Sequence, residues 1–266
     1  MLLVFDVGNS NIVFGLYSPA NGTEPARLVA DWRIATPYKQ TSDELGALLQ
    51  TLFTMRGFEM NVVTGVAISS VVPPLDPALR RVVEACFHVR PMFVEPGIRT
   101  GLSVLTDNPS EVGADRIVNC VAALELFGGP AIVVDLGTAT TFDVVSAKGE
   151  FLGGAIAPGI GISADALFAH AARLTRVEIK RPPKIIGTNT TDNLQIGLYY
   201  GSIGQIDGIL ERMIAELGPT TKTVATGGLA QLIAGDSRFI QNVDPMLTLT
   251  GLRLIYERNQ DRHKRR

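Results

Sequence analysis

The chain has 266 residues, of which 46% are hydrophobic and 19% are charged, and its formal net charge at pH 7 is −2. This composition supplies a large core and excludes global disorder. The near-neutral charge argues against a dedicated nucleic-acid binder, which would carry an excess of Lys and Arg. The cysteines, Cys86 and Cys120, are too few for a disulfide framework or a cysteine zinc site.

Neither a membrane span nor a signal peptide is predicted. No run of about 18 apolar residues occurs, and the opening MLLVFDVGN lacks the basic start of a signal peptide. Two cysteines without a pairing pattern are typical of reduced thiols. We therefore expect a cytoplasmic protein with no membrane partner.

The first part of the chain predicts an α/β arrangement in which strands precede helices. Apolar runs bounded by polar turns predict strands, and apolar residues at helical spacing after Ser42 predict a helix with a polar N-cap. The prolines after residue 72 predict the start of a second helix. The strands are expected at residues 2–7, 11–17 and 27–34 and within 62–72, and the helices at residues 42–53 and 73–86.

The second part of the chain repeats this arrangement after an irregular, proline-punctuated segment at residues 88–112. Apolar runs again predict strands, and longer amphipathic segments predict helices. The strands are expected at residues 131–135, 141–145 and 150–157, a strand followed by a glycine turn is expected at residues 223–228, and the helices are expected at residues 114–127, 160–172, 192–217 and 247–258.

A short pattern recurs about half a chain apart. Residues 4–10 read VFDVGNS and residues 133–139 read VVDLGTA, so both have two apolar residues, Asp, an apolar residue, Gly, a polar residue and a small one. Each copy follows a buried strand and precedes another. This echo favours two duplicated α/β domains with a cleft between them, and chance similarity of so short a pattern is the alternative.

An Asp-x-Gly turn between two strands is suited to binding phosphate. Glycine lets the backbone approach a ligand, and successive N–H groups of a turn form an anion-binding nest. An Asp at the strand end can hold a cation that bridges phosphate oxygens. A single turn of this kind is common in any protein, whereas two copies can hold a triphosphate from both sides. A third turn, at residues 226–228, either packs on a nucleoside or only connects a strand to a helix.

Asp115 and Arg116 lie in the segment NPSEVGADR at residues 108–116. A carboxylate can accept a proton from a substrate hydroxyl, and a neighbouring guanidinium can bind an anionic substrate group. The alternative is a helix N-terminus, where the macrodipole favours Asp115.

Other common catalytic motifs are absent from the sequence. It contains no P-loop, no Gly-x-Gly-x-x-Gly after a strand and no Gly-x-Ser-x-Gly. His88, His170 and His263 lack the spacing of a zinc-binding helix. Any nucleotide site must therefore use a different architecture.

Several segments together resemble the type III pantothenate kinases. They are DVGNSNIVFGL at 6–16, ISSVVPPL at 68–75, DNPSEVGADRIVN at 107–119, VVDLGTATTFDVV at 133–145, GGAIAPGIGIS at 153–163, ATGGLA at 225–230 and GLRLIYERN at 251–259. The resemblance implies the duplicated ribonuclease-H-like fold of sugar kinases, actin and heat-shock ATPases. We expect an N-terminal domain at residues 1–116 and a C-terminal domain at residues 117–266.

The resemblance also implies an activity. It is the transfer of the γ-phosphoryl group of ATP to the primary hydroxyl of pantothenate, which gives 4'-phosphopantothenate in the first step of coenzyme A biosynthesis. Mg²⁺ with ATP, a monovalent cation (K⁺ or NH₄⁺) and a homodimer are implied as well. Two alternatives keep the fold: a kinase of another small hydroxylated acid, and a catalytically silent, kinase-like regulatory protein.

Individual residues acquire expected roles by the same resemblance. Asp115 matches the proton acceptor, Asp135 matches the residue that holds the monovalent cation, and Asp6 is expected near magnesium. The expected ATP contacts are Asp6, Val7, Gly8, Asn9, Ser10, Asn11, Ile12, Val13 and Thr138. The expected pantothenate contacts are Gly113, Ala114, Asp115, Arg116 and Thr190.

Thr175 stands where Pro is frequent in the family, which is expected to be a tolerated loop variation, and two other departures from the family pattern bear on substrate binding. Thr106 stands where many relatives carry Tyr, which removes an aromatic wall and is expected to loosen pantothenate binding. Thr188 stands where Lys is common, which removes one positive charge. Loss of a site carboxylate would favour the silent regulator, but Asp6, Asp115 and Asp135 are all present.

Overall fold

The computed structural model describes residues 1–21, 24–171 and 174–260, which form two compact α/β units. Unit 1 comprises Met1–Leu102, Asn108–Ala122 and the chain from Thr248 onward. Unit 2 comprises Ser103–Asp107 and Ala123–Leu247. The expected domain boundary after residue 116 falls inside helix α3 (Ala114–Phe127), whose residues 114–122 belong to unit 1.

Unit 1 is built on a five-stranded mixed sheet with the order β3-β2-β1-β4-β5. The strands β1, β2 and β3 form an antiparallel meander, while β4 and β5 run parallel to β1. The bounds are β1 (Leu2–Val7), β2 (Asn11–Tyr17), β3 (Leu28–Ala35), β4 (Gly65–Ser70) and β5 (Met92–Phe93).

Unit 2 repeats this topology. Its sheet has the order β11-β10-β7-β8-β9-β6, in which β7, β8, β9, β10 and β11 take the places of β1, β2, β3, β4 and β5. The strand β6 is an additional edge strand that runs parallel to β9. The prediction of two duplicated α/β halves is therefore confirmed. The bounds are β6 (Ser103–Val104), β7 (Ala131–Leu136), β8 (Ala139–Val145), β9 (Glu150–Pro158), β10 (Lys222–Thr226) and β11 (Asn242–Val243).

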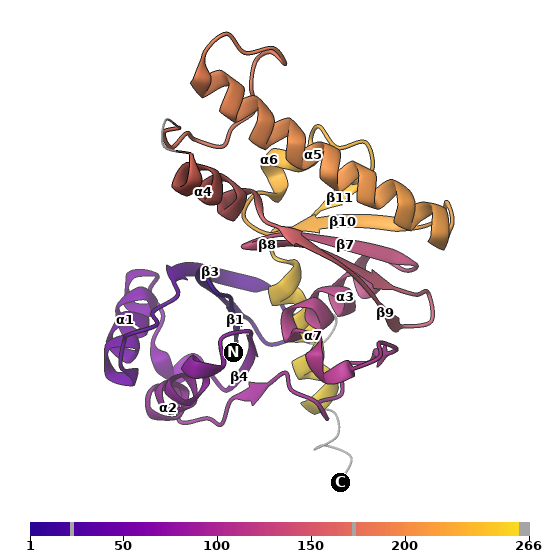
Figure 1. The fold of residues 1–266 in the computed structure, drawn as a ribbon. Helices are drawn as coiled ribbons and strands as arrows, with labels where there is room; N and C mark the ends of the chain where they lie inside the picture. Colours follow the sequence, from indigo (N-terminus) through magenta and orange to yellow (C-terminus); the bar gives the residue numbers. More distant parts are fainter. Residues whose placement is uncertain (22–23, 172–173, 261–266) are drawn as a thin grey trace. The chain divides into compact units, whose positions relative to one another are not determined.

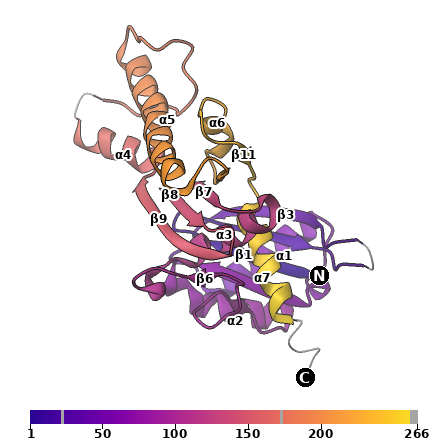
Figure 2. The same ribbon diagram turned by 90° about the vertical axis from the view of Figure 1, so that its right-hand side faces the viewer.

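Helices cover the sheets in both units (Figures 1 and 2). In unit 1, α1 (Ser42–Met55) and α2 (Asp76–Phe87) lie on one face of the sheet, and α7 (Leu247–Gln260) lies on the other. In unit 2, α4 (Ile160–His170), α5 (Thr190–Leu217) and α6 (Ala230–Ala234) lie together on one face. Short 3₁₀ helices occupy Met60–Val62, Pro73–Leu75 and Pro109–Glu111. Among the described residues, no helix combines the length and the apolar character that crossing a membrane requires.

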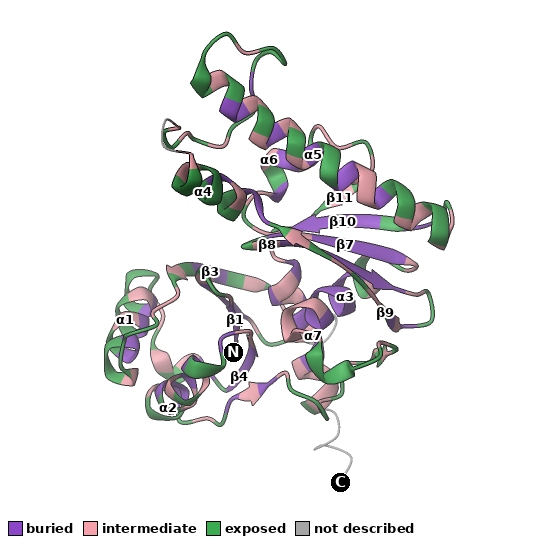
Figure 3. Cartoon of the chain, in the orientation of Figure 1, coloured by how far each residue is buried: buried purple, intermediate pink, exposed green. Residues whose placement is uncertain are grey.

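A stack of aromatic rings joins the sheet of unit 1 to α1. The ring centroids are 5.2 Å apart for Phe5 and Phe14, 5.1 Å for Phe14 and Trp32, and 5.1 Å for Trp32 and Phe53. The first three rings come from adjacent strands in register, and the fourth comes from the helix. The strands of both units are largely buried (Figure 3). This rigid layer holds the loops that follow β1 and β4.

The expected longer elements are all present, with small shifts at their ends. The first helix begins at Ser42 because Thr41 and Glu44 form a capping box, and α5 begins at Thr190 because Asn189 caps it. The expected end of a helix at residue 172 lies outside the described residues. The sequence did not predict β5, β6, β11 or α6, because elements of two to five residues are too short to show a periodic pattern.

The close packing of α7 on α3 gives a stability prediction. A Cβ atom on Gly251 would overlap the carbonyl oxygen of Val118 and would lie 2.8 Å from Val118 Cγ1. We expect Gly251→Ala to lower the free energy of unfolding by about 1–3 kcal/mol, the usual cost of overpacking. Chemical denaturation is the measurement.

The matched control is Gly201→Ala in α5, because no described atom lies within 4 Å of the Cβ position there. That change should stabilise the protein by up to about 1 kcal/mol through helix propensity. Equal effects of the two substitutions would contradict the packing argument.

Candidate active site

The first candidate phosphate turn connects β1 to β2. Asp6 is the penultimate residue of β1, and the Gly8 N–H donates to the Asn11 carbonyl at 3.0 Å to close the turn. Thr36 fixes the turn from the next strand end, since its hydroxyl donates to Gly8 O at 2.6 Å and its N–H donates to Ser10 O at 3.1 Å. Asn9 and Ser10 remain exposed at the tip. The turn is thus held rigidly with its polar tip open to ligands.

The second turn connects β7 to β8 and has the same place in unit 2. Asp135 is the penultimate residue of β7, and its cross-strand partner is Thr141, as Val13 is the partner of Asp6. The Gly159 N–H donates to the Thr138 carbonyl at 3.1 Å. A Cβ atom on Gly159 would overlap that carbonyl, so only glycine fits here. The start of α4 is therefore packed against the turn.

The turn after β10 lies directly beside Asp135. Gly227 has φ of +94°, and a Cβ atom there would lie 2.6 Å from Asp135 Oδ1 and 2.7 Å from the backbone of Leu136. The backbone conformation and the close approach both require glycine. Two turns of unit 2 therefore lie beside one carboxylate, so the turn at residues 226–228 has a closer link to Asp135 than a plain strand–helix connection implies.

Asp115 lies in the first turn of α3, in unit 1. Its Oδ1 accepts a hydrogen bond from the Arg116 N–H at 2.8 Å. A Cβ atom on Gly113 would lie 2.6 Å from Asp115 Oδ1 and 3.6 Å from Val71 Cγ1, and the Val71 N–H donates to Val7 O at 3.0 Å. Asp115 is therefore placed at the end of β1 and β4 that also carries the first turn.

Burial sets the protonation of Asp115. Loss of water contact raises the pKa of this carboxyl above its ordinary value, and this outweighs the Arg116 N–H and guanidinium, which lower it. Asp115 is half-buried, and its raised pKa is compatible with the proton-acceptor interpretation.

The predicted residues divide between the two units. Asp6, the turn to Val13 and Gly113–Arg116 belong to unit 1, whereas Asp135, Thr138 and Thr190 belong to unit 2. Thr190 is the exposed first residue of α5. The structure brings the residues of unit 1 to one edge of its sheet, and it brings Asp135 and Thr138 to the equivalent edge in unit 2.

The two departures that bear on substrate binding have different surroundings. Thr188 Oγ1 lies 3.3 Å from Lys184 Nζ, so a positive charge is present near the position where Lys is common. Thr106 is in unit 2, and its Oγ1 is buried without a hydrogen-bond partner among the described residues.

Three polar residues near the predicted carboxylates were given no role of their own by the sequence analysis, which considered Thr226 only as part of the turn at residues 226–228. Ser69 on β4 pairs with Asp6, and Thr226 on β10 pairs with Asp135, in the same parallel register. Asp143 is fully buried and accepts a hydrogen bond from Thr141 at 2.8 Å. Ser69 and Thr226 lie in the motifs ISSVV and ATGG. Their positions beside the two carboxylates follow only from the parallel pairing of the strands.

The described residues contain no group of three or more His, Cys, Asp or Glu side chains that could hold a metal ion. Asp6 and Asp135 are single carboxylates at strand ends beside backbone turns. Such sites suit cations that also bind phosphate oxygens, because Mg²⁺ in phosphate sites commonly uses only one or two protein carboxylates.

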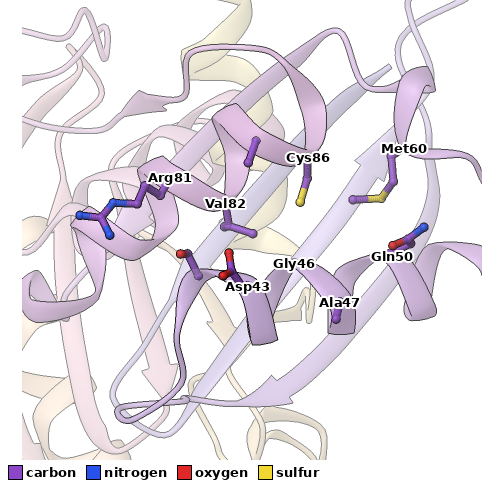
Figure 4. A pocket seen from close by; sticks show the side chains of 10 residues that line it. Asp43, Gly46, Ala47, Gln50, Met60, Arg81, Val82 and Cys86 are labelled. Carbon is purple, nitrogen blue, oxygen red and sulfur yellow. The ribbon is translucent and has the colours of Figure 1, made fainter.

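A pocket of about 620 Å³ lies between α1 and α2 in unit 1 (Figure 4). These helices cover the face of the sheet that carries Phe5 and Val7, opposite to Asp6. None of the predicted site residues lines the pocket. Its lining residues are Ser42, Asp43, Gly46, Ala47, Gln50, Met60, Arg81, Val82, Ala85 and Cys86.

Comparison with known proteins adds the family relationships. A family profile described as type III pantothenate kinase matches residues 2–212. The type III pantothenate kinase of Koribacter versatilis is 58% identical, and the match covers 100% of this chain and 98% of the relative. That of Acidobacterium capsulatum is also 58% identical, with coverage of 97% and 94%. That of Myxococcus xanthus is 55% identical, with coverage of 97% and 99%.

Two solved structures support the fold. The activator of the 2-hydroxyisocaproyl-CoA dehydratase from Clostridium difficile, with bound ADPNP, has a TM-score of 0.56 at 10% identity, covering 99% of this chain and 97% of that one. A ROK family glucokinase from Streptomyces griseus has a TM-score of 0.53 at 11% identity, covering 96% and 98%. The duplicated ribonuclease-H-like fold is confirmed.

The buried Asp115 carboxyl gives a pH prediction. Because the native pKa is raised, the native protein binds more protons than the unfolded chain above the ordinary value of 3.8. This group's contribution to stability therefore falls as pH rises from 3.8 through the native pKa and stays low above it. We expect Asp115→Asn to be at least as stable as the wild type at pH 7, with a difference that shrinks toward pH 4.

Thermal unfolding between pH 4 and pH 7.5 measures this difference. A variant clearly less stable than the wild type at pH 7 would instead assign Asp115 to stabilising the start of α3.

Proposed function

This chain belongs to the type III pantothenate kinase family, and from that membership we propose how its residues perform the family's reaction. The protein is an enzyme that phosphorylates pantothenate with ATP in coenzyme A biosynthesis. The names of the full-length relatives do not favour a kinase of another acid or a silent regulator. The presence of all three expected carboxylates agrees with this function.

The first turn is proposed to hold the phosphates of ATP. The family implies ATP with a divalent metal ion, and we propose Mg²⁺ at Asp6. The donor set fits: a half-buried carboxylate stands at the base of a rigid turn with an exposed tip, and a buried hydroxyl without a protein partner lies beside it. Magnesium supplies neutralisation of phosphate charge when bound. Residues from Val7 to Val13 supply backbone N–H groups and polar side chains.

The second turn is proposed to hold the monovalent cation and the nucleotide. Asp135 is the proposed ligand of K⁺ or NH₄⁺, and Thr138 is the proposed ATP contact. The proposal is supported by the position of Asp135 near the end of β7, where the backbone of the Gly227 turn comes close to its carboxylate. Positive charge at this point would reduce repulsion between Asp135 and the phosphates without a lysine side chain.

Asp115 is proposed as the general base. Its carboxylate accepts the proton of the pantothenate primary hydroxyl while that oxygen bonds to the γ-phosphorus and the bond to ADP breaks. A pKa raised by burial makes the carboxylate a stronger base. Arg116 is proposed to bind the pantothenate carboxylate through its planar guanidinium, and Gly113 and Ala114 to line the substrate.

Thr190 is proposed to contact pantothenate in a homodimer. Exposed apolar side chains of unit 2, including Ile156, Ile185 and Ile186, support an interface on this unit. Sedimentation is the direct test of the assembly. We also place the enzyme in the cytoplasm, because Cys86 and Cys120 are free thiols and such thiols persist in a reducing compartment.

The assigned base gives the first activity prediction. Asp115→Asn should lower kcat by about 10²–10⁴ because the amide keeps the shape but cannot accept the proton.

Arg116→Lys should raise the KM for pantothenate more than it lowers kcat, because lysine keeps the charge but loses the planar fork. The measurement is ADP release with and without pantothenate. If the wild type releases ADP independently of pantothenate, the proposed activity is contradicted. If Asp115→Asn has a near-normal kcat, the assignment of Asp115 as the general base is contradicted.

The proposed cation site gives the second activity prediction. Asp135→Asn should raise the KM for ATP and weaken activation by K⁺, because the amide lacks the charge that retains the ion. Rates are compared in K⁺, NH₄⁺ and Na⁺ at constant ionic strength. Unchanged K⁺ activation in Asp135→Asn would show that Asp135 does not hold the cation. The control is Glu211→Gln, a substitution of an exposed residue on α5, which should leave K⁺ activation unchanged.

A further inference from the structure

Ser69 carries a buried hydroxyl that the fold leaves unpaired. The residue is 1% exposed, and Ser69 Oγ has no hydrogen-bond partner among the described residues. Buried hydroxyls are normally paired, because an unpaired one loses its hydrogen bonds to water without replacement. The neighbouring Ser70 is different, since its Oγ accepts a hydrogen bond from the Val72 N–H at 3.2 Å. The Ser70 hydroxyl therefore has a hydrogen bond to the backbone, whereas the Ser69 hydroxyl has no partner within the described part of the chain.

The register of the sheet places Ser69 beside Asp6. The two residues are direct partners in the parallel pair of β1 and β4, and such strands lie about 4.8 Å apart. Phe5, Val7 and Ile68 point into the apolar core of unit 1. Side chains alternate along a strand, so Asp6 and Ser69 both lie on the opposite face of the sheet.

On this face, α7 packs against the other end of the strands. Leu249 approaches Gly15, the partner of Val4, and Tyr256 approaches Gly65, the partner of Leu2. At the carboxyl end of the strands, the neighbour is the segment of Gly113 and Asp115, through Val71. The carboxyl end of parallel strands is where open α/β sheets bind their ligands.

The same pair occurs in unit 2. Thr226 is the parallel partner of Asp135, and it is also 1% exposed. A hydroxyl residue therefore accompanies the strand-end carboxylate in both copies of the fold.

We propose that Ser69 belongs to the divalent metal site, where its hydroxyl donates a hydrogen bond to a water molecule bound to the ion at Asp6. This inference rests on the proposed role of Asp6. Mg²⁺ keeps several of its waters in protein sites, and groups that bond to those waters orient the ion. Ser69 is thus a positioning residue that acts through the metal's water shell.

The test compares metal binding and stability in the same variants. Ser69→Ala should raise the Mn²⁺ concentration for half-saturation of the protein–ADP complex about 10-fold, the lower end of the effect of such partners. Electron paramagnetic resonance of free Mn²⁺ reports the binding without any need for activity. The Tm of the ligand-free protein should be unchanged or higher, because the substitution removes an unpaired hydroxyl. Ser69→Thr, which keeps the hydroxyl, should restore Mn²⁺ affinity to within about 3-fold.

Two controls separate the possible outcomes. Ser70→Ala should lower the Tm, because it removes a hydrogen bond to the backbone. Asp6→Asn should weaken Mn²⁺ binding more than Ser69→Ala does. If Asp6→Asn has no effect on Mn²⁺ binding, the proposed metal role of Asp6 fails. If Asp6→Asn weakens binding while Ser69→Ala binds Mn²⁺ like the wild type, the proposal for Ser69 is overturned.

Discussion

The proposed mechanism depends on one electrostatic constraint: the three carboxylates assigned to the site have the same sign of charge as ATP. Such repulsion is strong wherever water is partly excluded. The sequence has no P-loop lysine to offset it. The proposed answer is to place cations at Asp6 and Asp135 and backbone N–H groups at the turns that follow. Close backbone approach then requires glycine, as the contacts of Gly159 and Gly227 show.

Duplication explains why the two strand-end carboxylates have matching surroundings. Both lie on the central strand of a sheet with the same strand order, one residue before the strand ends. Both have a parallel partner with a hydroxyl group, Ser69 in unit 1 and Thr226 in unit 2. A fold repeated in this way provides two similar turns, to which we assign different cations as a proposal. Asp115 has no such counterpart, because it comes from a helix start.

Much of the fold was predictable because its signals are local. Apolar runs, polar turns and caps are contained in short windows, and the repeated Asp-x-Gly pattern indicated the duplication. The positions of Asp6 and Asp135 were also predictable, since both lie near the ends of apolar runs and before glycine turns. Ser69 was not identifiable, because a serine in an apolar strand looks like any small core residue. Its role depends on pairing with a strand that lies some sixty residues earlier in the chain. The burial that raises the pKa of Asp115 is likewise a property of packing around the α3 start.

The central claim is that Asp6 and Asp135 each hold a cation of a different kind. Anomalous diffraction from crystals grown with Mn²⁺, a non-hydrolysable ATP analogue and Tl⁺ in place of K⁺ tests this claim most directly. The account predicts a manganese peak at the Asp6 carboxylate and a thallium peak at the Asp135 carboxylate, with the phosphates bound to both turns. Phosphates bound away from these turns, or a thallium peak remote from Asp135, would contradict it.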